Sequence, residues 1–268
     1  MNRSQSLKAL LLLLLLVPNC QGQTFTSGAT ESSSNRRDEG ALGVLKSTLL
    51  ALTPGEGSTI SDYRLEGTVT RWDGREISGT FSTIGVGAAD RRTSISIGSP
   101  VFSLLVINNA GILQFGASNP PRNIPNEIAM EAPYYFFLNL LQEALQDQHV
   151  EVILTPSPDN SPNIEAIKIT RHMAIWAPAM GTLGSAQFEV YIDTSSNTVT
   201  RIVNLARLES NFGQTVPHVV NFSDYRREQG WLLPHNIDET YAGAPHNSFT
   251  LVTYSFNKGL SISDLSSQ

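Results

Sequence analysis

The stretch that decides the fold is residues 60–84, which read ISDYRLEGTVTRWDGREISGTFSTI. In its first half the apolar side chains of Leu65 and Val69 alternate with polar ones, which is the period of a strand with one buried face. Asp73-Gly74 follows, and this pair accepts the positive φ angles of a tight hairpin turn. The second half has the pattern of a returning strand. The stretch therefore predicts an antiparallel β-hairpin.

The same strand pattern recurs along most of the chain. Further strands are predicted at residues 91–97, 101–107, 112–115, 150–154, 164–175, 187–193, 198–208, 218–226, 232–241 and 248–256. Strands that follow one another without intervening helices pair antiparallel, and a sheet of about ten strands usually curls. We predict one antiparallel, strongly curved sheet over residues 58–260. Residues 119–125 are interpreted as a proline-rich crossing without regular structure.

Two helices interrupt the strands. The first begins after Asp38, a residue that caps helices, and ends at Thr53-Pro54-Gly55. Its apolar face consists of Leu42, Leu45, Leu49 and Leu52. The second is predicted from Pro133, which suits a first helical position, to Gln146.

The second helix has an unusually wide apolar stripe. One face carries Tyr134, Leu138, Leu141 and Leu145, and Phe137, Leu140 and Ala144 widen it. A stripe of this width requires apolar partners on more than one side. It is either an ordinary core helix or one wall of an apolar cavity. We therefore predict that this helix packs on the concave face of the sheet.

The N-terminus is typical of a cleaved export signal. Positive charge at Arg3 and Lys8 precedes an unbroken leucine run at residues 10–16, and Cys20-Gln21-Gly22 offers small residues before a cleavage site. The run is shorter than the ~20 residues of a membrane-spanning helix. The alternative, a lipoprotein signal acylated at Cys20, is disfavoured because the residues before that cysteine are not small.

These patterns divide the chain into four parts. We predict a signal peptide at residues 1–22, a disordered polar leader at 23–39, one domain at 40–262 and a tail at 263–268. The full chain has a net charge of −6, and loss of Arg3 and Lys8 with the signal makes it more acidic. An acidic surface disfavours nucleic acid, and no later segment is apolar enough to predict a transmembrane span. Its one cysteine lies in the signal, so disulfides are not expected.

Catalytic and metal-binding motifs are absent from the sequence. The five histidines are His149, His172, His218, His235 and His246, and none lies three or four residues from another. Neither a zinc site nor a cofactor is predicted. The nearest acid–histidine pairs are His218 with Asp224 and His235 with Asp238, which leaves a secreted hydrolase as the alternative to a non-enzymatic protein.

Three segments follow one another in the C-terminal part of the chain. They are FEVYID at 188–193 with TVTR at 198–201, VNFSDYR at 220–226 with Gly230 and Leu233-Pro234, and YSFNKGL at 254–260. In this order they resemble the LolA-like superfamily of periplasmic carriers and sorters of outer-membrane lipoproteins. The similarity extends over roughly residues 40–262. It implies an α+β, mainly antiparallel fold, a strongly curved incomplete barrel with helices on the concave face.

The resemblance also implies a function. A LolA-like protein is expected to be periplasmic, to bind a lipid or the acyl chains of a lipoprotein, and to need no cofactor. A sensor or docking module on the same fold is the neighbouring alternative. The helix stripe and the strand pattern together predict an apolar cavity without a charged group at its base. Its candidate lining residues are Leu65, Val69, Phe81, Leu105, Tyr134, Phe137, Leu138, Leu141, Phe188, Val190 and Ile192.

Overall fold

The computed structural model describes residues 36–87, 90–98, 101–108, 110–116, 118–124, 136–157, 161–172, 185–207 and 215–266. The predicted signal, most of the predicted leader, Pro133 and Tyr134 lie outside these residues. The helices are α1 (Glu39–Leu52), α3 (Phe137–Gln146) and α4 (Ile262–Ser266). The strands are β1 (Asp62–Trp72), β2 (Glu76–Val86), β3 (Asp90–Ser96), β4 (Val101–Ile107), β5 (Ala110–Phe115), β6 (Arg122–Ile124), β7 (Glu151–Thr155), β8 (Ile164–His172), β9 (Ser185–Asp193), β10 (Thr198–Arg207), β11 (Thr215–Glu228), β12 (Trp231–Tyr241) and β13 (Ala244–Phe256).

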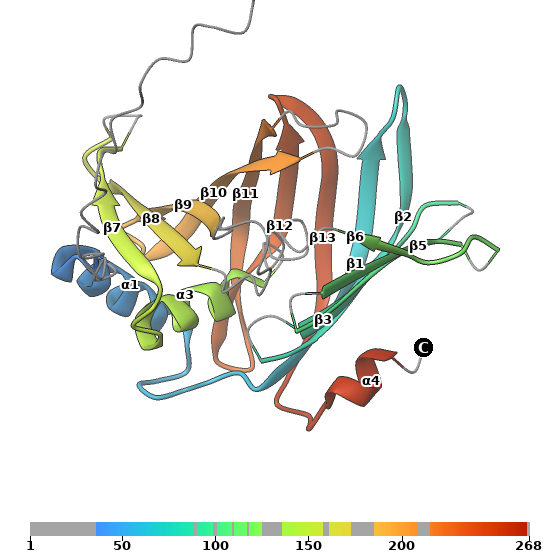
Figure 1. Cartoon of the computed structure of the whole chain (residues 1–268). Coiled ribbons are helices and arrows are strands. Elements are labelled where there is room, and N and C mark those ends of the chain that lie inside the picture. The colour runs from blue at the N-terminus through green and yellow to red at the C-terminus, as the bar shows by residue number, and fades with distance from the viewer. Residues whose placement is uncertain are drawn as a thin grey trace, which may run out of the picture. The chain divides into compact units, whose positions relative to one another are not determined.

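The described strands form one 13-stranded sheet in the order β6-β5-β4-β3-β2-β1-β13-β12-β11-β10-β9-β8-β7. Neighbouring strands are antiparallel, and β6 and β7 are the two edges, so the sheet is not closed. It curls around α1 and α3, which lie on its concave face (Figure 1). This confirms the predicted fold class.

The predicted hairpin is formed by β1 and β2. Trp72 faces Glu76 across the turn, and the backbone N–H of Asp73 donates to the carbonyl oxygen of Arg75 at 3.0 Å. Gly74 has a φ of +67°, a left-handed conformation that glycine adopts without steric cost. The turn residues therefore set the register of the strand pair on which the rest of the sheet is built.

Two glycines allow the sheet to bend sharply beside this hairpin. A Cβ atom at Gly67 would collide with the carbonyl oxygen of Thr250 on β13, and one at Gly79 with that of Ser96 on β3. The register between β1 and β13 also shifts next to Gly67. Close backbone approach at a glycine is one way that a sheet acquires strong curvature.

The first helix has the predicted ends. The Asp38 side chain accepts hydrogen bonds from the backbone N–H groups of Gly40 and Ala41, and the helix ends at the C-cap residue Thr53. The apolar face then buries Leu45 and other leucines against the sheet. None of the helices among the described residues has the length and apolarity of a membrane span.

The prediction that residues 119–125 cross without regular structure was wrong in one respect. Arg122–Ile124 forms the short edge strand β6, in which Arg122 is opposite Leu113 of β5. Prolines on both sides hid this strand from the sequence pattern. An edge strand needs backbone hydrogen bonds on one side only, so it tolerates such flanks.

The C-terminal helix α4 packs on the face of the sheet opposite to α1 and α3. Leu265 is fully buried there, and Arg92 of β3 donates a hydrogen bond from Nη1 to the Leu265 carbonyl oxygen at 3.2 Å. The helix lies against β2, β3 and β4. The predicted boundary between domain and tail at residue 262 falls inside this element.

Candidate ligand site on the concave face of the sheet

Most of the predicted lining residues come together in one buried cluster. Its members from that set are Leu65, Val69, Phe81, Phe137, Leu138, Leu141, Phe188, Val190 and Ile192. Each has at most 2 % of its surface exposed. Phe137 of α3 meets Phe222 edge-on, with 4.8 Å between the ring centroids. These side chains therefore already contact other protein atoms, and their role in lining a ligand cavity stays a prediction. Tyr134 lies outside the described residues.

Leu105 was predicted to face inward, and this was wrong. In β3, Ile95 belongs to the core cluster and faces Phe102 of β4. Residues directly opposite each other lie on the same face of a sheet, and successive residues alternate. Leu105, three residues after Phe102, therefore points to the convex face, where α4 packs. The strand reads VFSLLVI and has apolar side chains on both of its faces, so its sequence did not reveal which face points into the core.

The concave face of β4, β5 and β6 carries an apolar wall that the sequence pattern did not predict. Its residues, hereafter the β4–β6 wall, are Phe102, Leu104, Val106, Leu113, Phe115 and Ile124. Phe102 and Phe115 meet edge-on, with 5.5 Å between their ring centroids. Phe102, Leu104 and Val106 do alternate in β4, but the apolar residues between them hide this pattern in the sequence.

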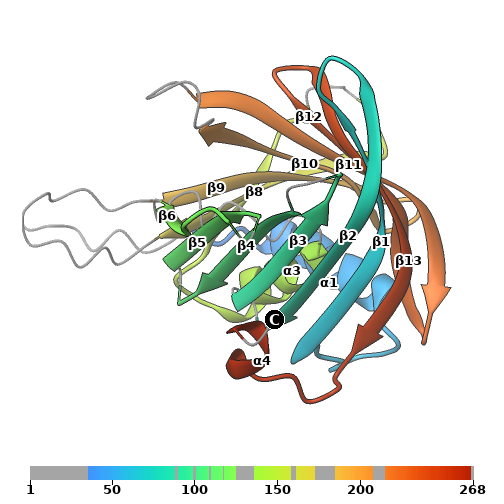
Figure 2. The same cartoon turned by 90° about the vertical axis from the view of Figure 1, so that its right-hand side faces the viewer.

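The β4–β6 wall meets the helix-containing core at Phe102, which packs against both clusters. The buried residues of α1 and α3 belong to the core cluster, and α1 lies against β7, β10 and β12 in the other arm of the sheet. Figure 2 shows the β3–β6 arm facing the β8–β10 arm, with the helices within the curve. Phe102, Leu104 and Phe115 are only half-buried. A minor part of each side chain is therefore accessible on the concave surface.

A buried polar cluster crosses the concave face from β10 to β13. His218 is fully buried, and its Nδ1 lies 2.8 Å from Asn204 Oδ1 and its Nε2 2.9 Å from Glu239 Oε1. Asn247 donates to the other oxygen of Glu239, and the Tyr241 hydroxyl donates to Oε1 at 3.3 Å. Glu239 is opposite Val220, a core residue, which places it on the concave face. This corrects the expectation of an interior without charge at its base.

The surroundings of Glu239 keep it ionised. Burial alone would raise the pKa of Glu239, because a charged group loses water. The hydrogen bond and positive charge of His218, together with the Asn247 hydrogen bond, outweigh burial and hold this pKa below its ordinary value. The cluster is therefore a satisfied ion pair across β11 and β12.

The predicted acid–histidine pairs do not form. Both ring nitrogens of His218 are engaged by Asn204 and Glu239. Asp224 does not meet His218 but accepts at Oδ2 a hydrogen bond from Arg226 Nη2 at 2.6 Å. His235 lies with its Nδ1 2.9 Å from the carbonyl oxygen of Leu251. Among the described residues, no group of three or more His, Cys, Asp or Glu side chains is placed to hold a metal ion.

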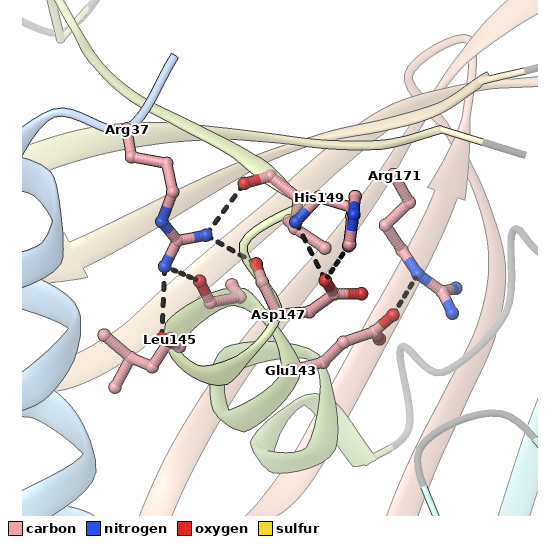
Figure 3. A network of polar contacts seen from close by, with 8 residues as sticks. Arg37, Glu143, Leu145, Asp147, His149 and Arg171 are labelled. Carbon is pink, nitrogen blue, oxygen red and sulfur yellow. Dashed lines mark hydrogen bonds and ion pairs between the residues drawn. The ribbon is translucent and has the colours of Figure 1, made fainter. Parts of the chain in front are cut away.

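A second polar network holds the C-terminal end of α3 (Figure 3). The Arg37 guanidinium donates to four backbone carbonyl oxygens, those of Ala144, Leu145, Asp147 and Val150, at 2.7–3.1 Å. Carbonyl groups at a helix C-terminus lack partners within the helix and favour positive charge. Arg37 therefore ties the start of the domain to α3.

The comparisons with known proteins give likeness in structure only. No family model and no curated protein matches the sequence. An outer membrane lipoprotein-sorting protein domain from Vibrio parahaemolyticus is 11 % identical, with a TM-score of 0.52, over 85 % of this chain and 96 % of that one. A LolA superfamily protein from Nitrosomonas europaea is 8 % identical, with a TM-score of 0.53, over 84 % and 96 %. A DUF1329 family protein from Desulfovibrio piger is 12 % identical, with a TM-score of 0.50, over 84 % and 95 %.

The open 13-stranded sheet and the helices on its concave face place this chain in the class of LolA-like folds. Within that class its sequence is divergent, since at most 12 % of its residues are identical to any of these three structures. Identity this low establishes the fold alone. Function has to be argued from the concave site.

Proposed function

We propose that this chain is a non-enzymatic binding protein that holds the acyl chain of a lipid or lipoprotein on its concave face. The observation that carries the proposal is the β4–β6 wall, an apolar, half-buried surface on the inner side of an open sheet. Contiguous apolar surface that stays partly accessible on a concave face is typical of a ligand or partner site.

The energetics favour a hydrocarbon on this surface. Burial of an acyl chain stabilises a complex by about 0.8 kcal/mol per methylene and requires no reactive group. Phe102, Leu104 and Phe115 would contact the chain directly, because part of each side chain is accessible.

The most direct test changes the wall on one strand. Leu104→Asp should weaken binding of a fluorescent fatty acyl probe at least about tenfold, because a carboxylate on the wall must lose its water when the chain binds. The matched control is Ser103→Asp, also half-buried in β4 but on the opposite face, and it should change the affinity less than about twofold. Probe fluorescence titration measures both, after circular dichroism has verified folding.

Two results would decide against the acyl site. If the unmodified protein binds no acyl probe, a docking role on the same fold is the alternative that is left. If Leu104→Asp and Ser103→Asp weaken binding of the probe equally, the probe does not lie on the concave face. Asp at Leu141 or Val190 is a poorer test, since both side chains are fully buried and such variants are expected to misfold.

We place this function in the periplasm, after removal of residues 1–22. Intact-mass measurement of protein from the envelope fraction should give a chain that begins at Gln23, because the leucine run and the small residues before Gln23 favour cleavage there. A chain that begins with a diacylated Cys20 would show instead a membrane-anchored lipoprotein.

A further inference from the structure

A second candidate site lies on the polar face of α3, and its lining shares no residue with the β4–β6 wall. It is a cleft of about 270 Å³ lined by Thr59, Ile60, Gly87, Asn139, Gln142, Glu143, Gln146 and Asp147. The four α3 residues among them are spaced three and four apart, so they share one face of the helix. Leu138 and Leu141 are on the buried face of the same helix. The cleft therefore does not depend on the proposed acyl site.

Asn139 is the most informative residue in this cleft. Only 4 % of it is exposed, and its side-chain amide nitrogen donates to the carbonyl oxygen of Gly87 at 2.5 Å. A carbonyl accepts only from the NH₂ group, so this bond fixes the orientation of the amide. The other amide atom, Oδ1, is buried and has no hydrogen-bond partner. A buried acceptor of this kind can be satisfied by a donor from water or from a ligand.

The neighbouring groups of the cleft are acceptors too. Gln142 donates its amide nitrogen to the carbonyl oxygen of Ser58 at 3.3 Å, which leaves its Oε1 as an acceptor. Glu143 and Asp147 add two carboxylates. Arg171 binds one Glu143 oxygen at 3.0 Å, and the backbone N–H of His149 is the main cause that lowers the pKa of Asp147. Both carboxylates are visible beside α3 in Figure 3.

We propose that this cleft binds a primary ammonium group. An ammonium ion carries one positive charge and three donors, which matches a cleft with two amide oxygens and two carboxylates. An anion would meet like charge there, and a hydrocarbon would leave the Asn139 oxygen unpaired. A lysine side chain of a polypeptide and the ethanolamine of a lipid headgroup both supply this chemistry.

The test is a titration followed by NMR on the whole mature chain. The probes are N-acetyl-lysine methylamide, ethanolamine and the neutral N-acetyl-norleucine methylamide. We expect saturable shifts of backbone amides at residues 139–147 with the two ammonium probes and none with the norleucine compound. A preference for the lysine compound assigns a polypeptide ligand, and a preference for ethanolamine assigns a lipid headgroup.

Charge removal provides the second measurement. The double variant Glu143→Gln with Asp147→Asn keeps the side-chain oxygens that accept hydrogen bonds from Arg171 and His149 but removes both negative charges. It should weaken binding of the ammonium probes about tenfold. The control pair, Glu76→Gln with Asp238→Asn, removes two exposed charges from β2 and β12 and should leave the affinity unchanged. In the unmodified protein, higher salt should also weaken binding.

The proposal is overturned if the norleucine compound shifts the same amides as strongly, or if none of the three probes gives saturable shifts. It is also overturned if the charge-removed variant binds the ammonium probes as well as the control does. Because the acyl probe is measured separately, loss of acyl binding does not affect these outcomes.

Discussion

Replacing His218 by leucine should lower the free energy of unfolding by about 3–5 kcal/mol, because the change leaves the buried Glu239 carboxylate without its charged partner. Glu239 is only 4 % exposed. His218, on β11, is fully buried and contacts Asn204 of β10 and Glu239 of β12. Urea denaturation followed by tryptophan fluorescence measures the loss, since Trp231 is buried in the core.

The control for this prediction is the double variant His218→Leu with Glu239→Leu. Replacing both members of a buried ion pair with apolar residues is often nearly neutral, so the double variant should recover most of the lost stability. A double variant as unstable as the single one would show that the cluster acts through packing and not through charge.

The same pair makes the stability depend on pH. Because the folded state holds the pKa of Glu239 below its ordinary value, the ionised carboxylate stabilises the fold above about pH 4.5. This contribution is lost as the pH falls further, through the lowered pKa of the folded state. Glu239→Gln should therefore lose less stability on acidification than the unmodified protein, and equal losses would contradict the assignment.

Replacing Arg37 by methionine should have the second largest effect, a loss of about 2–3 kcal/mol of unfolding free energy. Methionine keeps the apolar stem of the side chain but removes the donors to the four carbonyl oxygens at the end of α3. Hydrogen exchange should also become faster at residues 144–150, because the last turn of α3 then opens more easily.

The matched control is Arg36→Met, at the exposed neighbouring position. Both variants remove one positive charge from the same segment, so a change in net charge affects them equally. If Arg36→Met destabilises the protein as much as Arg37→Met, the helix-end contacts are not the cause. Arg37→Lys should lie between the two, since an ammonium group cannot reach as many carbonyls as a guanidinium.

The local elements of this fold could be predicted because each has a signal within a few residues. Asp38 caps α1 and the leucines after it repeat at helical spacing, so the start and the buried face of the helix were predicted correctly. The Asp73-Gly74 turn and the alternation on both sides of it gave the β1–β2 hairpin. The edge strand β6 was missed because prolines surround it and it spans three residues.

The candidate site was only partly predictable. Most of the predicted interior residues are buried together, because alternation in β1, β2 and β9 distinguishes the two faces. In β4 both faces are apolar, so Leu105 was assigned to the wrong face and Leu104, on the accessible wall, was overlooked. The strand's burial depends on its neighbours and not on its own sequence.

The sequence by itself determined the two helices of the concave face, most of the strands, the antiparallel order and the apolar face of α3, since these follow from turn chemistry and from periods of two and 3.6 residues. Only the tertiary structure decided which polar groups meet. His218 and Glu239 are 21 residues apart, and Arg37 is 107 residues from Ala144. Contacts at such separations depend on how the sheet curls and where the helices dock, which is a property of the whole packed chain and leaves no local signal.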